Sequence, residues 1–211
     1  PGRYGRLGGG LRSLSATDLA LPVAQTIVPE ALKPAISQVI LGQVLTAGSG
    51  MNVARQLGLR VGLPQSVPAF VTSMVCGSGM KAVALAADAI ASGEAALVLT
   101  GGVESMSRAP HYATDLRSGC KLGDSTLVDA ILADGLTDPV LKIGMGETAE
   151  RIAETCGIPR AEQDAFALLS QQRAAASRDV FQREIVPIEA REGIVQHDEH
   201  AQTGLLQLAE D

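Results

Sequence analysis

The sequence predicts an α/β fold in which buried strands alternate with helices in a single sheet. Apolar runs rich in β-branched residues, each of strand length, occur at 36–45, 67–75 and 95–100. Segments with helical periodicity and capping signals occur at 15–28, 52–62 and 80–92. Hydrophobic residues make up 46% of the 211 residues and aromatic residues only 2%, so small aliphatic side chains must fill the core. Tight α/β layers suit this composition, and the alternation favours crossover connections with helices on both faces of the sheet.

Capping residues and glycines predict where the first two helices begin and end. Ser15 or Thr17 is suited to cap the first helix, and Asp18 lies favourably in its first turn. The second helix is expected to start near Asn52 and to stop at Gly62.

The segment 67–102 is predicted to form a strand, a helix and a second strand, with a cysteine at the turn into the helix. The first apolar run breaks at Cys76, which Gly77-Ser78-Gly79 follows. Ser92-Gly93 is a stop signal before the second strand. Apolar residues of the helix share one face, at Met80, Val83, Ala87 and Ile90.

The residues after Gly102 have a different character. The segment 103–138 is rich in polar residues and glycine, with one short helical pattern at 127–132, and is predicted to be a long functional loop or small subdomain. Helices are expected at 146–155 and at 160–177. Residues 184–189 are predicted to form an edge strand because they contain a proline, and the tail from Gly193 shows no pattern.

Charge and cysteine content exclude several classes of protein. The net charge of −6 argues against general binding of nucleic acid or of an anionic membrane, and no apolar stretch is long enough to span a bilayer. The three cysteines have no paired or metal-like spacing, which favours a reducing compartment over secretion. We expect the cytoplasm. An organelle matrix is the alternative, because the sequence begins at Pro1 without a methionine and an N-terminal segment can be missing.

Cys76 is the strongest candidate for chemistry. A thiol at a helix N-terminus lies beside unpaired backbone N–H groups and the positive end of the helix dipole, both of which favour the nucleophilic thiolate. Gly77 and Gly79 leave room for a substrate carbonyl, and the same N–H groups can stabilise an oxyanion. These features suit acyl transfer through a thioester. The alternative is a buried structural cysteine, since free cysteine is among the most buried residue types.

The other candidates favour structural roles. Cys120 has a neighbouring cation but no accompanying base, and Cys156 is expected to pack in the interior. Glu104 follows a predicted strand end, where either a site or a structural hydrogen bond is plausible. His197 and His200 stand in a polar run without a distant third ligand, so a solvated tail is favoured over a metal site.

Motifs dispersed over nearly the whole chain resemble those of the thiolase family. Each piece alone is weak, but together they occur in order and at the spacing of the family. They are GRLGG at Gly5–Gly9, LSATDL at Leu14–Leu19, VILGQVL at Val39–Leu45, NVARQ at Asn52–Gln56, VPAF at Val67–Phe70, VCGSGMKAV at Val75–Val83, GGVESMS at Gly101–Ser107, DGLTD at Asp134–Asp138, MGETAE at Met145–Glu150, EQDAFALLSQQRA at Glu162–Ala174 and EIVPI at Glu184–Ile188.

The resemblance implies a two-step acyltransferase. Cys76 would accept an acyl group from an acyl-CoA, with its own backbone N–H in one oxyanion hole. An acyl-CoA enolate would then take the acyl group to form acetoacetyl-CoA, or CoA would cleave a 3-ketoacyl-CoA in the reverse direction. Leu136 and Met145 would line the pantetheine or acyl pocket. Coenzyme A enters as a substrate thioester and no separate cofactor is implied. The family also implies a homodimer or homotetramer.

The family fold is a layered αβαβα arrangement of two similar halves, of which this chain would supply the N-terminal half. By analogy, residues 1–102 form the α/β core, residues 103–160 a loop domain for CoA and oligomer contacts, and residues 161–211 a return helix, an edge strand and a polar tail. We therefore expect the chain to be part of a longer thiolase. The second-half Gly-His-Pro histidine and second cysteine of the family have no counterpart in this sequence.

One residue departs from the short-chain biosynthetic pattern, and two other functions stay open. Gly144 replaces the histidine that usually precedes the methionine of this motif, which leaves chain length open and makes degradative 3-ketoacyl specificity more plausible. A ketoacyl-synthase-like condensing enzyme also carries a cysteine at such a turn, although the GSG and GGVESMS segments resemble thiolases more closely. The second alternative is a truncated, non-catalytic partner with the thiolase fold.

Overall fold

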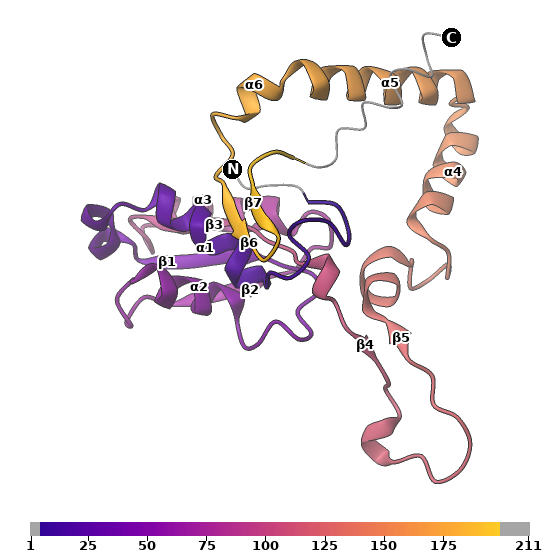
Figure 1. Ribbon diagram of the computed structural model, residues 1–211, viewed down its shortest axis with the longest axis horizontal. Helices are drawn as coiled ribbons and strands as arrows, with labels where there is room; N and C mark the ends of the chain where they lie inside the picture. Colours follow the sequence, from indigo (N-terminus) through magenta and orange to yellow (C-terminus); the bar gives the residue numbers. More distant parts are fainter. Residues whose placement is uncertain (1–4, 199–211) are drawn as a thin grey trace. The chain divides into compact units, whose positions relative to one another are not determined.

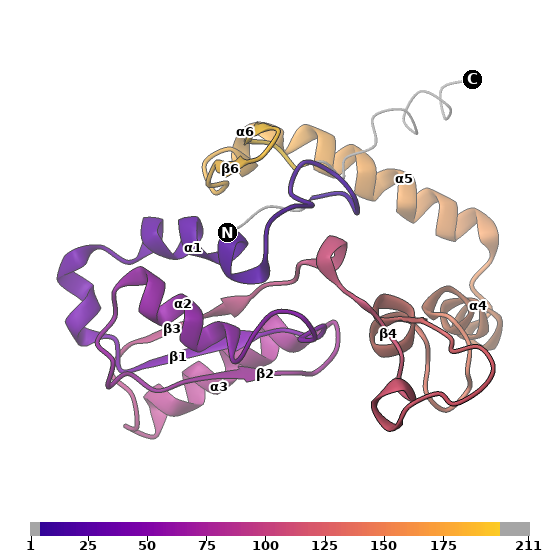
Figure 2. The same cartoon turned by 60° about the horizontal axis from the view of Figure 1, so that its bottom comes forward.

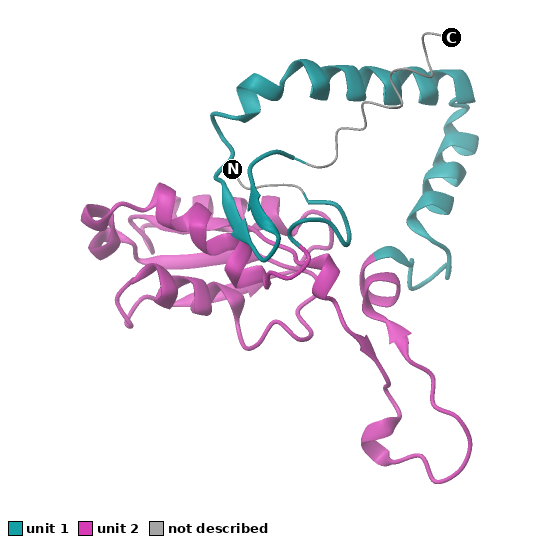
Figure 3. Cartoon of the chain, viewed as in Figure 1, with its two compact units in different colours: residues 1–11, 136–211 teal, residues 12–135 magenta. Residues whose placement is uncertain are grey.

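The computed structural model describes residues 5–198, which fall into two compact units (Figure 1, Figure 3). The core unit comprises residues 12–135, and the second unit comprises residues 1–11 and 136–211. These units are defined by contacts within the chain. The three functional segments 1–102, 103–160 and 161–211 therefore remain a prediction.

The core unit holds the parallel sheet and most of the short elements. Its elements in chain order are α1 (Ala16–Ile27), the 3₁₀ helix η1 (Glu30–Ala35), β1 (Gln38–Gly42), α2 (Val53–Val61), β2 (Ala69–Thr72), α3 (Ser78–Ala91), β3 (Val98–Gly102), the 3₁₀ helix η2 (Met106–Arg108), β4 (His111–Tyr112), the 3₁₀ helix η3 (Leu116–Ser118) and β5 (Val128–Asp129). A π-helix, η4 (Leu132–Leu136), follows. The second unit contains α4 (Met145–Cys156), α5 (Arg160–Ala176), α6 (Arg178–Phe181), β6 (Ile188–Ala190) and β7 (Gly193–Val195).

The sheet of the core unit is parallel, as the alternation of strands and helices predicted. Its order is β2-β1-β3, and Ile40 of the central strand lies opposite Phe70 on one side and Thr100 on the other. Helices cover both faces: α1 and α2 lie on one side and α3 on the other (Figure 2). The predicted α/β fold is confirmed.

Alternation along β1 divides the core between the two faces of the sheet. Val39 and Leu41 pack with buried residues of α1 and α2, including Leu57. Ile40 points the other way and packs against Ala82 and Ala86 of α3. A central strand that is buried on both faces explains why the sequence of β1 is a continuous apolar run.

The first turn of α3 lies directly on the carboxyl ends of β1 and β3, and glycines make this approach possible. A Cβ atom built on Gly42 would lie 2.3 Å from the carbonyl carbon of Ser78. A Cβ atom on Gly102 would lie 3.0 Å from the Cα of Gly79. Any side chain at Gly42 would therefore displace the helix.

This close approach decides which face of α3 is buried. The apolar residues at helical spacing, Met80, Val83, Ala87 and Ile90, do share a face, but that face is exposed, and Met80 is 76% accessible. Small residues occupy the side against the sheet, at Ser78, Ala82, Ala86 and Ala89. Hydrophobicity alone pointed to the opposite face, because a helix this near to a sheet has room only for small side chains beneath it.

The predicted ends of the first two helices are confirmed. Ser15 caps α1 in a capping box, accepting a hydrogen bond from the backbone N–H of Asp18 while the Asp18 carboxylate accepts from the backbone N–H of Ser15. Asn52 caps α2 and also donates its side-chain amide to the carbonyl of Ala69. Gly62 closes α2 in the left-handed conformation.

Several predicted elements are shifted or of another type. The strands at 67–75 and 95–100 are the shorter β2 and the later-ending β3. The helical pattern at 127–132 is β5 followed by η4. The strand expected at 184–189 starts only after Pro187, as β6. It pairs with β7, which lies in the tail from Gly193 for which no strand was predicted. Apolar content located these segments, but it could not separate a two-residue strand from a helical turn.

Within residues 5–198, none of the helices is both long enough and apolar enough to cross a bilayer.

The close approach of α3 predicts the effect of Gly42→Ala. The added methyl group would overlap the backbone of Ser78, so we expect the free energy of unfolding to fall by about 3 kcal/mol. Urea denaturation followed by circular dichroism measures this change. Gly101→Ala is the control, because nothing lies within 4 Å of its added Cβ, and its effect should stay within about 0.5 kcal/mol. Equal stability of Gly42→Ala and wild type would contradict the packing described.

Candidate active site

Cys76 lies on the turn that joins β2 to α3, at the carboxyl end of the parallel sheet. The side chain is exposed, which contradicts the alternative of a buried structural cysteine. Gly77 occupies the N-cap position of α3 and Ser78 is the first residue of the helix. The predicted place of Cys76 at a strand-to-helix turn is confirmed. Ligand sites of open α/β sheets form at this edge of the sheet.

The turn is held in a strained conformation next to the thiol. Val75 has φ +46°, in the left-handed region that β-branched residues rarely adopt. Such a residue costs on the order of 1–3 kcal/mol and persists only when its surroundings hold it. The Ser78 hydroxyl provides part of this hold, since it accepts from the Met74 N–H at 2.9 Å and donates to the Val75 carbonyl at 2.6 Å.

Sequence reasoning did not find the parts played by Val75 and Ser78. A valine does not predict positive φ, because the residues that commonly adopt that conformation are glycine and asparagine. Ser78 lies between Gly77 and Gly79 in the motif, and no separate role was predicted for it. Its burial, at 4% accessibility, and its two backbone contacts become visible only in the folded chain.

Backbone hydrogen bonds within the turn reduce the number of N–H groups that can stabilise an oxyanion. The N–H groups of Gly77 and Ser78 donate to the carbonyls of Met74 and Val75, each at 3.0 Å. These two groups are already satisfied, so the broader expectation of several N–H donors is wrong for them. The prediction stands for the N–H of Cys76 itself.

Glu104 makes structural hydrogen bonds, which was one of the two roles predicted for it. Its carboxylate accepts the backbone N–H of Val44 at 2.8 Å and that of Leu45 at 3.3 Å. These N–H groups follow the end of β1, so the carboxylate fastens the β1–α2 loop to the segment after β3. A charge-assisted bond of this kind is stronger than a neutral one.

Among residues 5–198, the remaining cysteines and histidines are not gathered into a metal-binding cluster. Cys120 is exposed, with its Sγ 3.4 Å from the carbonyl of Gly123. Cys156 is also exposed, at the end of α4, so the expectation that it packs is wrong. His200 lies outside the described residues, and residues 5–198 contain no group of three or more His, Cys, Asp or Glu side chains placed to hold a metal ion.

Leu136 and Met145, the predicted substrate-lining residues, belong to the second unit and flank one closed loop. Thr137 and Gly144 pair across this loop in an antiparallel bridge, which places the two candidates as its next outward neighbours. Leu136 is 37% accessible and Met145 is 38% accessible, so both present apolar surface. The structure thus brings Leu136 and Met145 together, while Cys76 belongs to the core unit.

The loop between Leu136 and Met145 is organised by Asp138. Its carboxylate accepts the backbone N–H groups of Leu141 at 2.6 Å and Val140 at 2.8 Å. These bonds, first that of Leu141 and then that of Val140, hold the pKa of Asp138 below its ordinary value of 3.8, with help from the charges of Lys142 and Arg151.

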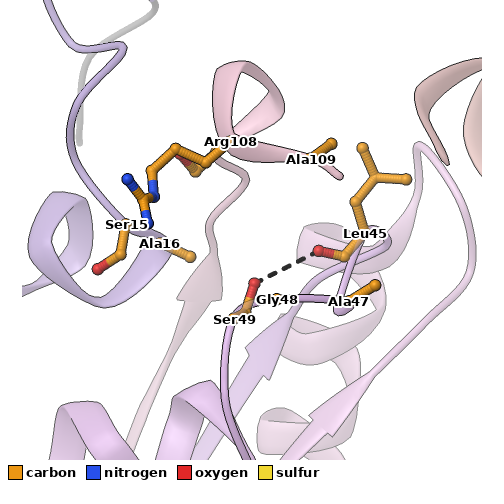
Figure 4. Close-up of a pocket in the computed structure, with 9 residues that line it drawn as sticks. Ser15, Ala16, Leu45, Ala47, Gly48, Ser49, Arg108 and Ala109 are labelled. Carbon is orange, nitrogen blue, oxygen red and sulfur yellow. Dashed lines mark hydrogen bonds between the residues drawn. The ribbon is translucent and has the colours of Figure 1, made fainter. Parts of the chain in front are cut away.

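The core unit also contains a small pocket. It is lined by the start of α1, the β1–α2 loop and the η2 turn, with Ser15, Ser49, Ser105 and Arg108 as its polar side chains (Figure 4). The pocket has room for about one water molecule, and Cys76, Leu136 and Met145 are not among its lining residues. It does not define the site.

The fold and the turn define a class of protein: an α/β protein that presents an exposed cysteine at the start of a helix, after a parallel strand. Comparison with known families then gives the family. The model of the thiolase N-terminal domain matches residues 2–207. The chain belongs to the thiolase family, as the motifs predicted.

The relatives are acyltransferases of bacteria and animals. An acetyl-CoA acetyltransferase of Chromobacterium violaceum is 50% identical over 188 residues, which cover 87% of this chain and 48% of that protein. The cytosolic acetyl-CoA acetyltransferase of Rattus norvegicus is 46% identical, over 81% of this chain and 45% of its own length. The chain therefore spans about half the length of the curated relatives that it matches.

Solved structures confirm the thiolase fold. An acetyl-CoA acetyltransferase from Syntrophomonas wolfei superposes with a TM-score of 0.89 at 37% identity, over 99% of this chain and 54% of that one. Human mitochondrial 3-ketoacyl-CoA thiolase in complex with CoA superposes with a TM-score of 0.86 at 37% identity, with the same coverage. The residues of this chain correspond to about half of the layered fold.

The Asp138 loop predicts a pH dependence. Because the folded pKa is depressed, the stabilisation is fully present above the ordinary value of 3.8 and is lost as the pH falls through the lower folded value. We expect the amide resonances of Val140 and Leu141 to change together below pH 3.8 in an NMR titration. Asp138→Asn, which keeps an acceptor without the charge, should remove this titration. An inflection at or above 3.8 would contradict the loop geometry.

Proposed function

We propose that this chain accepts acyl groups from acyl-CoA thioesters on the thiol of Cys76, the first half of a thiolase-type acyl transfer. The observation that carries the proposal is an exposed thiol on a fixed turn at the start of α3, in a chain that belongs to the thiolase family. Relatives named acetyl-CoA acetyltransferases support the same reaction class.

The proposed step exchanges one thioester for another. The Cys76 sulfur attacks the carbonyl carbon of the acyl-CoA, the bond between that carbon and the CoA sulfur breaks, and the thiol proton passes through a base to the departing CoA. The start of α3 beside Cys76 cannot accept the thiol proton, because a helix terminus is not a base. A base must therefore come from another group. The Gly-His-Pro histidine that the family uses is not in this sequence.

The second half-reaction needs a further acid/base group to move a proton α to a thioester. In that step an acyl-CoA enolate takes the acyl group, or CoA releases it in the degradative direction. We therefore assign acylation of Cys76 to these 211 residues and expect complete turnover only together with such groups.

Leu136 and Met145 are proposed to line the pantetheine or acyl pocket. Their positions on either side of the Thr137–Gly144 bridge and their exposed apolar surface support this assignment. Gly144 has φ −72°, a conformation open to any residue, and a Cβ atom there would lie 3.6 Å from a Glu147 oxygen. The glycine is thus not required by the backbone, so we propose that it widens the range of acyl groups accepted.

We propose that the protein acts in a reducing compartment such as the cytoplasm, as a homodimer or homotetramer, with CoA as substrate and no separate cofactor. Three exposed, unbridged cysteines support the compartment, because such thiols persist where disulfides are kept reduced.

Incubation of the chain with acetyl-CoA tests the proposal. We expect one acetyl group on the tryptic peptide that contains Cys76, detected by mass spectrometry, because this thiol is exposed on the turn at the start of α3. Cys76→Ala should reduce the label to the level of urea-denatured chain. The double variant Cys120→Ala/Cys156→Ala should keep it, since both thiols lie outside the turn. Acetylation of Cys120 or Cys156, with none on Cys76, would refute the assignment.

A further inference from the structure

We propose that Ser78 is a positioning residue for the nucleophile: its buried hydroxyl holds Val75 in the left-handed conformation that sets the direction of Cys76. The inference rests on the proposed role of Cys76 in acyl transfer. It adds a residue that acts through the backbone of the turn and does not touch the substrate.

The Ser78 hydroxyl bonds both residues that precede the cysteine. It accepts the N–H of Met74 at 2.9 Å and donates to the carbonyl of Val75 at 2.6 Å. The side chain is 4% accessible, so water is poorly placed to replace either bond. One hydroxyl thus closes a ring of backbone around Cys76.

Val75 needs such a restraint. Its φ of +46° is unfavourable for a β-branched residue, and its side chain is 50% exposed, so side-chain packing contributes little to holding it. The backbone bonds from Gly77 to Met74 and from Ser78 to Val75 act on the same segment. The hydroxyl adds a side-chain restraint, which a substitution can remove.

Ser78 is itself anchored to the sheet. Its backbone lies so close to Gly42 that a Cβ atom there would overlap its carbonyl group, and Ala82 and Ala86 continue the contact along α3. The hydroxyl therefore links the turn to a residue whose position is fixed by the sheet. Loss of the hydroxyl should leave α3 docked but allow Val75 to return to negative φ, which would turn the thiol away from its present direction.

A comparison of two reagents distinguishes a change in the orientation of the Cys76 thiol from a loss of stability of the fold. Iodoacetamide is small and attacks an exposed thiol from many directions, forming the carbon–sulfur bond as iodide leaves. Acetyl-CoA must present its carbonyl carbon in one geometry. In Ser78→Ala we expect the rate of Cys76 acetylation to fall on the order of 10-fold, because misplacement of a reacting group has such effects. Alkylation by iodoacetamide should change less than about 3-fold, since it needs no such geometry.

Three variants make the test specific. Ser78→Thr keeps the hydroxyl and should restore most of the acetylation rate. Ser92→Ala removes a hydroxyl at the other end of α3, where it donates to the carbonyl of Ala89, and should leave both rates unchanged. Val75→Gly tolerates positive φ without strain, so Ser78→Ala should cost less in the Val75→Gly background than in wild type.

Hydrogen exchange reads the turn without any acyl substrate. The Met74 amide donates to the Ser78 hydroxyl, so its protection should be lost in Ser78→Ala and regained in Ser78→Thr. Unchanged protection of Met74, equal losses with both reagents, or no loss with acetyl-CoA would overturn the role of Ser78. A wild-type chain that is not acetylated on Cys76 would instead refute the proposed function, and the Met74 measurement would still decide whether the hydroxyl holds the turn.

Discussion

The contact between the first turn of α3 and the carboxyl ends of β1 and β3 is the constraint on which the rest of the core unit depends. It requires Gly42, because a single added carbon would overlap the backbone of Ser78. It also explains the small residues beneath the helix and the exposure of larger ones such as Met80. The same contact fixes the position of Ser78, from which the turn carrying Cys76 is held.

Much of this arrangement could be predicted from the sequence, because it depends on local patterns. The capping box at Ser15, the start of α2 at Asn52 and the cysteine at a strand-to-helix turn all follow from residue type and spacing. The buried face of α3 could not be predicted from hydrophobicity, since it is set by the distance between helix and sheet. The left-handed Val75 could not be predicted either, because valine has no local preference for positive φ and is held there by Ser78, whose own position depends on the contact between α3 and the sheet.

The assignment to the thiolase family and the chemistry of the site rest on different grounds. The family follows from matches along nearly the whole chain, at up to 50% identity among the relatives compared. The proposed role of Cys76 is argued from its exposure and from its turn at the start of α3. Since the chain spans about half the length of those relatives, acylation of the thiol and completion of the catalytic cycle are separate questions. Acylation of Cys76 distinguishes the two alternatives: an active enzyme would be acylated, and a non-catalytic partner would not.

The strain at Val75 also has a consequence for the order of folding. A valine gains nothing from positive φ until Ser78 and the sheet are in place, so we expect the turn to form after α3 has docked. By the same reasoning, local opening of the native state should release this turn before the strands separate. The thiol of Cys76 would then be one of the last groups to reach its native geometry and one of the first to lose it. Its reactivity would report the integrity of the surrounding core more sensitively than secondary structure does.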